Sequence, residues 1–158
     1  GRTNRRFQNL YLSGGVFLGG TGSANELDDY EEGAWTPVPK AGNDTISHSV
    51  SRSRYIKIGS SVTISATINF DEDSPSGGFL SIQGLPFTSS TNIENHGAVM
   101  FNDVHFLHTY QTMNAYMFPP NSKVEFYGTR DAADWVALNG SEVRADSTVQ
   151  FTMTYFIA

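Results

Sequence analysis

The side chains that could hydrolyse a glycosidic bond are carboxylates in the second half of the chain. Glu125, Asp131 and Asp134 lie close together in the sequence, and a pair of such groups could donate and accept the proton that this reaction transfers. Asp131 and Asp134, however, belong to the polar segment TRDAADW, where aspartate usually stabilises turns. The G-x-S-x-G pattern of serine hydrolases is also absent from the sequence. We therefore expect that the chain is not an enzyme.

Metal binding is the second chemistry that the residue types allow. The chain contains His48, His96, His105 and His108, and the pair in VHFLH lacks the glutamate of the helical zinc motif. In a strand, this spacing places two side chains on opposite faces, which favours a role in the core or in an interface. The acidic run DEDSPSGG is similar to a calcium loop but lacks its glycine and its closing glutamate, so a hairpin turn is favoured. Because cysteine is also absent, we expect no metal and no cofactor.

Alternation of apolar and polar residues dominates the sequence and predicts strands that would position these groups. SVTISATINF (61–70) and TVQFTMTYFI (148–157) place apolar side chains on one face and mostly polar side chains on the other, as in half-buried antiparallel strands. Shorter strands are expected at 46–50, 54–58, 79–83, 98–102, 110–117, 123–127 and 135–138. Turn residues in IGSS, FPPNS and LNGS separate them, and no window has a helical period. The pattern predicts an all-β sandwich or barrel, and we expect an antiparallel, jelly-roll-like β-sandwich.

The N-terminal segment differs in kind from the rest of the chain. It is rich in glycine and contains an apolar row, formed by Leu10, Leu12, Val16, Phe17 and Leu18. Two very short strands cannot bury such a row by themselves, and an exposed row would favour aggregation. We therefore predict an extended stem at 1–34 through which several chains associate, followed by a β-sandwich domain at 35–158. Identical stems from several chains would cover one another, and two-fold pairing would satisfy the same burial argument.

Charge and hydropathy exclude two classes of partner. The 158 residues have a net charge of −6, which disfavours nucleic acid, and no apolar run is long enough to span a membrane. The low charged fraction of 16%, with abundant serine, threonine, asparagine and glycine, is typical of extracellular or virion β-proteins. The acidic run ANELDDYEEG needs cationic partners if several copies meet. The expected partners are Arg2, Arg5, Arg6, Arg52, Arg54 and Lys57.

Several motifs resemble those of bacteriophage tail fibre and tailspike proteins. The run RRFQNLYLSGGVFLGGTGSANELDDYEEGAWTP resembles a segment that precedes the terminal β-domain near their distal end. RYIKIGSSVTISATINF, LSIQGLPFTSS and DSTVQFTMTYFIA are similar to later strands of the same domain. The first motif is long and specific, and together the motifs cover most of the chain. Residues 91–140 match least.

The resemblance implies a homotrimer located in the virion, in a tail fibre or tailspike. In such proteins the terminal domains form trimers and bind glycans on the host surface, so the partners would be a bacterial surface polysaccharide or lipopolysaccharide. The polysaccharide-degrading β-helix lies upstream in that family, which implies binding without cleavage here. A purely structural trimerisation cap without a ligand remains an alternative, and a polysaccharide hydrolase is a less favoured one.

A glycan site needs aromatic faces beside hydrogen-bonding groups, because sugars present apolar C–H patches next to hydroxyls. One part of the chain combines them: Tyr110, Asn114, Tyr116, Tyr127, Arg130, Asp131, Asp134 and Trp135. Tyr127 and Trp135 could equally be core residues of the sandwich. The apolar residues after Trp135 favour burial, whereas its charged neighbours favour the surface, so both interpretations remain open.

Overall fold

The computed structural model describes residues 9–27, 29–74, 77–90, 92–119 and 122–158, and most of the regular structure in them is antiparallel strand. The strands are β1 (Val16–Phe17), β2 (Glu26–Leu27), β3 (Tyr30–Gly33), β4 (Val38–Ala41), β5 (Asp44–Thr45), β6 (His48–Ile58), β7 (Ser61–Phe70), β8 (Leu80–Gln83), β9 (Asn95–Asn102), β10 (Thr112–Met117), β11 (Val124–Arg130), β12 (Ala133–Ala137) and β13 (Thr148–Phe156). Helical structure in these residues is limited to the 3-10 turns η1 (Ser23–Asn25) and η2 (Gly140–Glu142). The predicted all-β fold class is confirmed.

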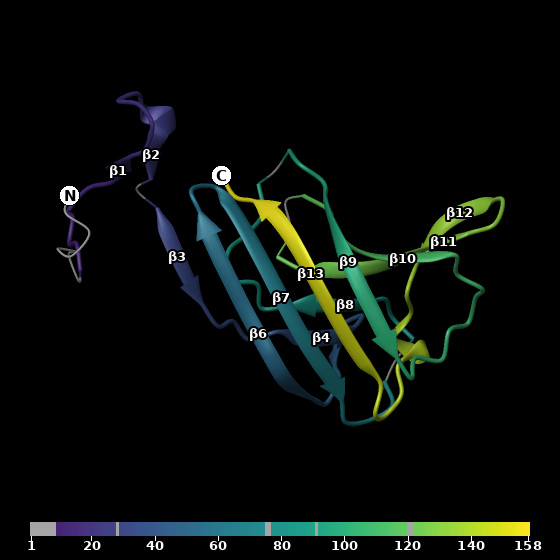
Figure 1. The fold of residues 1–158 in the computed structure, drawn as a ribbon. Coiled ribbons are helices and arrows are strands. Elements are labelled where there is room, and N and C mark those ends of the chain that lie inside the picture. The colour runs from purple at the N-terminus through teal and green to yellow at the C-terminus, as the bar shows by residue number, and fades with distance from the viewer. Residues whose placement is uncertain (1–8, 28, 75–76, 91, 120–121) are drawn as a thin grey trace, which may run out of the picture.

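One eleven-stranded sheet folds over on itself to form both layers of the sandwich. Its strand order is β3-β6-β7-β13-β9-β10-β11-β8-β4-β5, with β12 paired to the free side of β11. Figure 1 shows β6, β7, β13 and β9 side by side, with β10, β11, β8 and β4 behind them at a different angle. The β11–β12 hairpin projects beyond both layers (Figure 1).

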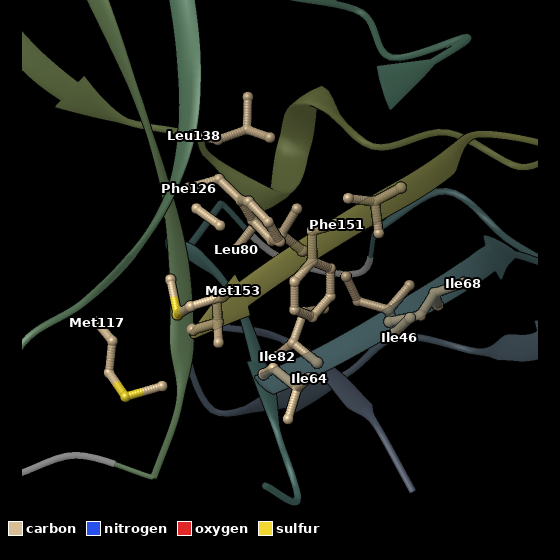
Figure 2. Close-up of a cluster of buried hydrophobic side chains, with 14 of the residues drawn as sticks. Ile46, Ile64, Ile68, Leu80, Ile82, Met117, Phe126, Leu138, Phe151 and Met153 are labelled. Atoms are coloured by element: carbon tan, nitrogen blue, oxygen red, sulfur yellow. The ribbon is translucent and has the colours of Figure 1, made fainter. Parts of the chain in front are cut away.

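The core lies between the two layers and is built by the predicted alternation. In β7 the inward side chains Val62, Ile64 and Ile68 are fully buried, while the intervening Thr63 is exposed. Phe126 of β11 meets Phe151 of β13 with ring centroids 5.7 Å apart, although two strands separate them within the sheet. Figure 2 shows these rings among the buried isoleucine, leucine and methionine side chains. The apolar contact across the layers holds the folded sheet closed.

Two sequence expectations for single elements are wrong. The strands expected at 46–50 and 54–58 form one strand, β6, because a bulge between Val50 and Arg52 lets the pairing with β7 continue through the polar stretch. Residues 103–111, including His105 and His108, form a connection rather than a strand, and Tyr110 precedes β10.

Among the described residues, the N-terminal segment joins the large sheet through its last strand, β3. β1 and β2 form a separate two-stranded sheet, whereas β3 pairs with β6 at one edge of the large sheet. The residues of the apolar row are exposed: Leu10 by 70%, Leu12 by 52%, Val16 by 36%, Phe17 by 48% and Leu18 by 60%. The division at residue 34 stays a prediction.

One of the expected charge pairs of the acidic run is present. Asp29 forms an ion pair with the buried ammonium of Lys57. Among the described residues, Arg52 and Arg54 form no ion pair with the acidic run. Arg2, Arg5, Arg6 and Asp28 lie outside the described residues.

Candidate ligand-binding site

A cavity of about 250 Å³ opens on the outer face of the β9–β12 part of the sheet. Its lining consists of His96, Asn114, Tyr116, Tyr127, Thr129 and Trp135, and we call it the aromatic groove. The strand register explains why these side chains meet. Tyr116 lies opposite His96, and Asn114 lies opposite Tyr127, so alternate residues of neighbouring strands share one face.

Ring contacts fix the wall of the aromatic groove. The Trp135 ring centroid lies 5.1 Å from that of Tyr116, at an interplanar angle of 90°, and 5.2 Å from that of Tyr127. Phe118 packs behind Tyr116 with a centroid distance of 4.4 Å. Such edge-to-face and tilted contacts orient rings without covering them completely. Trp135 is 51% exposed, so it lies on the surface and not in the core of the sandwich.

The two tyrosine hydroxyls of the wall have different surroundings. Tyr116 is 7% exposed, and its hydroxyl has no hydrogen-bond partner of acceptable geometry among the described residues. Burial, and secondarily the neighbouring Glu94 carboxylate, raises the pKa of Tyr116 to about 12, so the hydroxyl keeps its proton. The Tyr127 hydroxyl donates a long hydrogen bond, 3.4 Å, to Glu125 Oε2. Burial and the Glu125 carboxylate raise the pKa of Tyr127 as well.

Other predicted ligand residues lie on the opposite face of β11. Tyr110 packs across Gly128, where an added Cβ would lie only 2.2 Å from its ring, and its hydroxyl donates to Glu142 Oε1 at 3.3 Å. Burial first, and then Glu142, raises the pKa of Tyr110 to about 12, while the nearby Arg130 opposes the shift. Arg130 follows Thr129 in β11 and therefore points away from the groove face.

The predicted aspartates lie on the projecting hairpin. Asp131 and Asp134 are exposed at and beside its tip, where Ala132 has a positive φ of 49°. Asp134 precedes Trp135 in β12, so the two side chains leave opposite faces of the strand. The structure therefore brings Asn114, Tyr116, Tyr127 and Trp135 together and leaves the charged residues outside the lining of the aromatic groove.

Sequence reasoning missed two residues that line the groove. Thr129 carries a usable signal, because it lies two residues after Tyr127 in the same strand and so shares its face. His96 carries none, because it comes from β9 and only the register between β9 and β10 places it beside Tyr116. Sequence alternation alone does not fix that register.

The described part of the chain shows neither a metal site nor a helix that could span a membrane. No group of three or more histidine, cysteine, aspartate or glutamate side chains there is arranged to hold a metal ion. None of the helical segments described is long and apolar enough to cross a bilayer.

The fold is similar to that of part of a solved phage tailspike. The solved structure described as "Crystal structure of Dettilon tailspike protein (gp208)" superposes with a TM-score of 0.66 and 19% sequence identity, over 80% of this chain and 24% of that chain. At this identity the likeness establishes a shared fold, and this chain spans about a quarter of the length of the tailspike. No protein-family model matches the sequence, and no curated protein matches it.

Proposed function

We propose that this chain is a distal domain of a phage tail fibre or tailspike that binds a glycan of the bacterial surface without cleaving it. The observation that carries the proposal is the aromatic groove, in which the half-exposed ring of Trp135 stands beside hydrogen-bonding side chains. The shared fold with the Dettilon tailspike supplies the context of a phage tail in the virion.

The groove suits a sugar ring better than most other ligands. The exposed indole offers an apolar platform for the C–H face of a sugar. Asn114 and Thr129, both exposed, offer an amide and a hydroxyl that can pair with sugar hydroxyls at the rim. The receptor of this class would be a surface polysaccharide or lipopolysaccharide.

The positions of the carboxylates support binding without hydrolysis. A glycosidase needs carboxylates on both sides of one bond. Glu125 faces the groove side of β11 and accepts a hydrogen bond from Lys123 Nζ at 2.5 Å, whereas Asp134 leaves the opposite face of β12. This arrangement does not offer an acid and a base to a single bound sugar.

The exposed apolar row supports assembly into a homotrimer. Leu10 and Leu18 expose most of their surface, and the β1–β2 unit pairs with no other strand described. Association of three stems would remove this surface from water. Light scattering should give the trimer mass, and Leu12→Asp should weaken assembly because it places a carboxylate in an apolar contact. A monomer at micromolar concentration would refute the trimer.

A purely structural cap is the second candidate, and the same apolar row favours it. Binding of the chain to arrayed bacterial lipopolysaccharides and capsular polysaccharides distinguishes the two functions. Trp135→Ala should abolish binding. The control Phe79→Ala removes a similarly exposed ring, 57% against 51%, and should leave binding intact. Binding that survives Trp135→Ala would place the ligand elsewhere, and no binding to any polymer would favour the cap.

A further inference from the structure

We propose that the aromatic groove selects uncharged sugar residues over acidic ones, and that Glu94 and Glu125 set this selectivity. The inference rests on the proposed function and adds the chemical class of the ligand. It starts from what surrounds Tyr116 in the sheet.

Two carboxylates bracket one end of the groove. Glu125 lies directly opposite Tyr116 on the β11 side. On the β9 side, Asn95 lies opposite Met117, so the preceding Glu94 falls beside Phe118 and diagonal to Tyr116. Burial first raises the pKa of both tyrosines, and the neighbouring carboxylate, Glu94 for Tyr116 and Glu125 for Tyr127, raises it further, in agreement with this placement of the two carboxylates.

Cations that would bind an acidic sugar are absent from the groove lining. Within the described residues, the lining contains neither lysine nor arginine. The Lys123 ammonium is already engaged by Glu125, and Arg130 points to the other face of β11. Proteins usually bind carboxylates through such cations, with arginine giving paired hydrogen bonds. Among the described residues, a uronate in this groove would therefore meet the Glu94 carboxylate and the Glu125–Lys123 ion pair, with no further cation in the lining to offset its own charge.

The aromatic wall adds to the same preference. The faces of tyrosine and tryptophan rings carry partial negative charge, which disfavours an anion and leaves an uncharged C–H face unaffected. The polar side chains at the rim, Asn114 and Thr129, are uncharged and can form hydrogen bonds with sugar hydroxyls. The groove thus matches a neutral sugar in polarity and charge.

The test compares acidic bacterial polysaccharides with their own carboxyl-reduced forms, which differ only in that group, alongside naturally neutral polymers. Binding of the whole chain is measured at low ionic strength, where repulsion by the exposed Glu94 is least screened. Binding that depends on Trp135 should be confined to neutral and carboxyl-reduced polymers, with acidic forms weaker by about tenfold or more. Glu94→Gln should reduce the ratio of the affinity for the carboxyl-reduced polymer to that for its acidic form. The exposed control Asp44→Asn, on a strand outside the groove, should leave this ratio unchanged.

Each other outcome has a distinct meaning. An acidic polymer that binds in a Trp135-dependent way and is lost on carboxyl reduction would overturn the selectivity while leaving the proposed function intact. A ratio that Glu94→Gln leaves unchanged would overturn the role given to Glu94. The absence of any Trp135-dependent binding would overturn the glycan-binding function itself, and the selectivity with it.

Discussion

The two faces of β11 differ in how their buried carboxyl and phenol groups are paired, although the buried Arg130 Nε on the inner face also has no partner among the described residues. On the inner face, the buried Glu142 carboxylate accepts hydrogen bonds from the backbone of Leu107 and Asn139, both at 2.7 Å, and from Tyr110. On the outer face, the aromatic groove leaves Trp135 half exposed and the Tyr116 hydroxyl without a good partner. Complete pairing stabilises a fold, whereas incomplete pairing costs stability and is tolerated at sites that bind ligands. The comparison predicts that the Glu142 network contributes more to stability than the aromatic groove does, and it agrees with the recognition proposed for the outer face.

The strongest test of this division is Glu142→Ala. The carboxylate anchors the 103–111 connection and closes η2 through a reciprocal cap with Asn139. Its removal leaves the partly buried backbone donors of Leu107 and Asn139 unpaired and a cavity where the buried carboxylate was, so the free energy of unfolding should fall by about 2–4 kcal/mol. Chemical denaturation measures this loss. Glu142→Gln retains one acceptor oxygen and should lose less, and equal stability of Glu142→Ala and wild type would contradict the division.

Trp135→Ala should show the reverse pattern. It removes a larger side chain than Glu142→Ala does, yet the indole is 51% exposed, so the free energy of unfolding should fall by only about 1 kcal/mol from lost ring contacts. Denaturation of both variants under the same conditions tests the ranking. A loss for Trp135→Ala equal to that for Glu142→Ala would mean that the outer face also supports the fold.

Tyr116→Phe sharpens the comparison further. The substitution deletes a buried hydroxyl that has no partner of acceptable geometry, so it should raise the free energy of unfolding by about 0.5–1 kcal/mol and the melting temperature slightly. Tyr155→Phe is the matched control, because the Tyr155 hydroxyl donates to the Phe87 carbonyl at 3.0 Å and its loss should destabilise. If Tyr116→Phe were as destabilising as the control, the Tyr116 hydroxyl would have to be paired.

The smallest effects are expected at the hairpin tip. Asp131→Ala and Asp134→Ala alter exposed side chains outside the groove lining, so stability should change by no more than about 0.5 kcal/mol. Binding to a polymer recognised by wild type should change less than it does in Trp135→Ala. A large loss of binding would extend the site from the groove onto the hairpin tip.

Sequence reasoning predicts the elements of this molecule better than it predicts their pairing. The alternation in 61–70 predicts β7 with the bounds that the structure has, because one buried and one exposed face produce a strong period of two. The clustering of aromatic residues in 110–135 similarly indicates the stretch of chain that contributes Tyr116, Tyr127 and Trp135 to the aromatic groove. The sequence cannot tell that Tyr110 and Arg130 face the core side, since this depends on where β10 begins and on the packing of Tyr110 over Gly128.

The position of β13 has a consequence for how the chain reaches its native state. Although β13 follows every other described strand in the sequence, it lies between β7 and β9 in the middle of the sheet. Strands β3, β6 and β7 therefore cannot join β9 and its neighbours within the sheet until residues 148–156 have been synthesised, because β7 and β9 have no direct pairing to bridge them, whereas β4 can already pair with β8. Until then one edge of β7 remains unpaired, and such an edge is open to pairing with other chains. Completion of the sheet thus waits for β13, which favours cooperative folding of the whole domain over stepwise addition of strands.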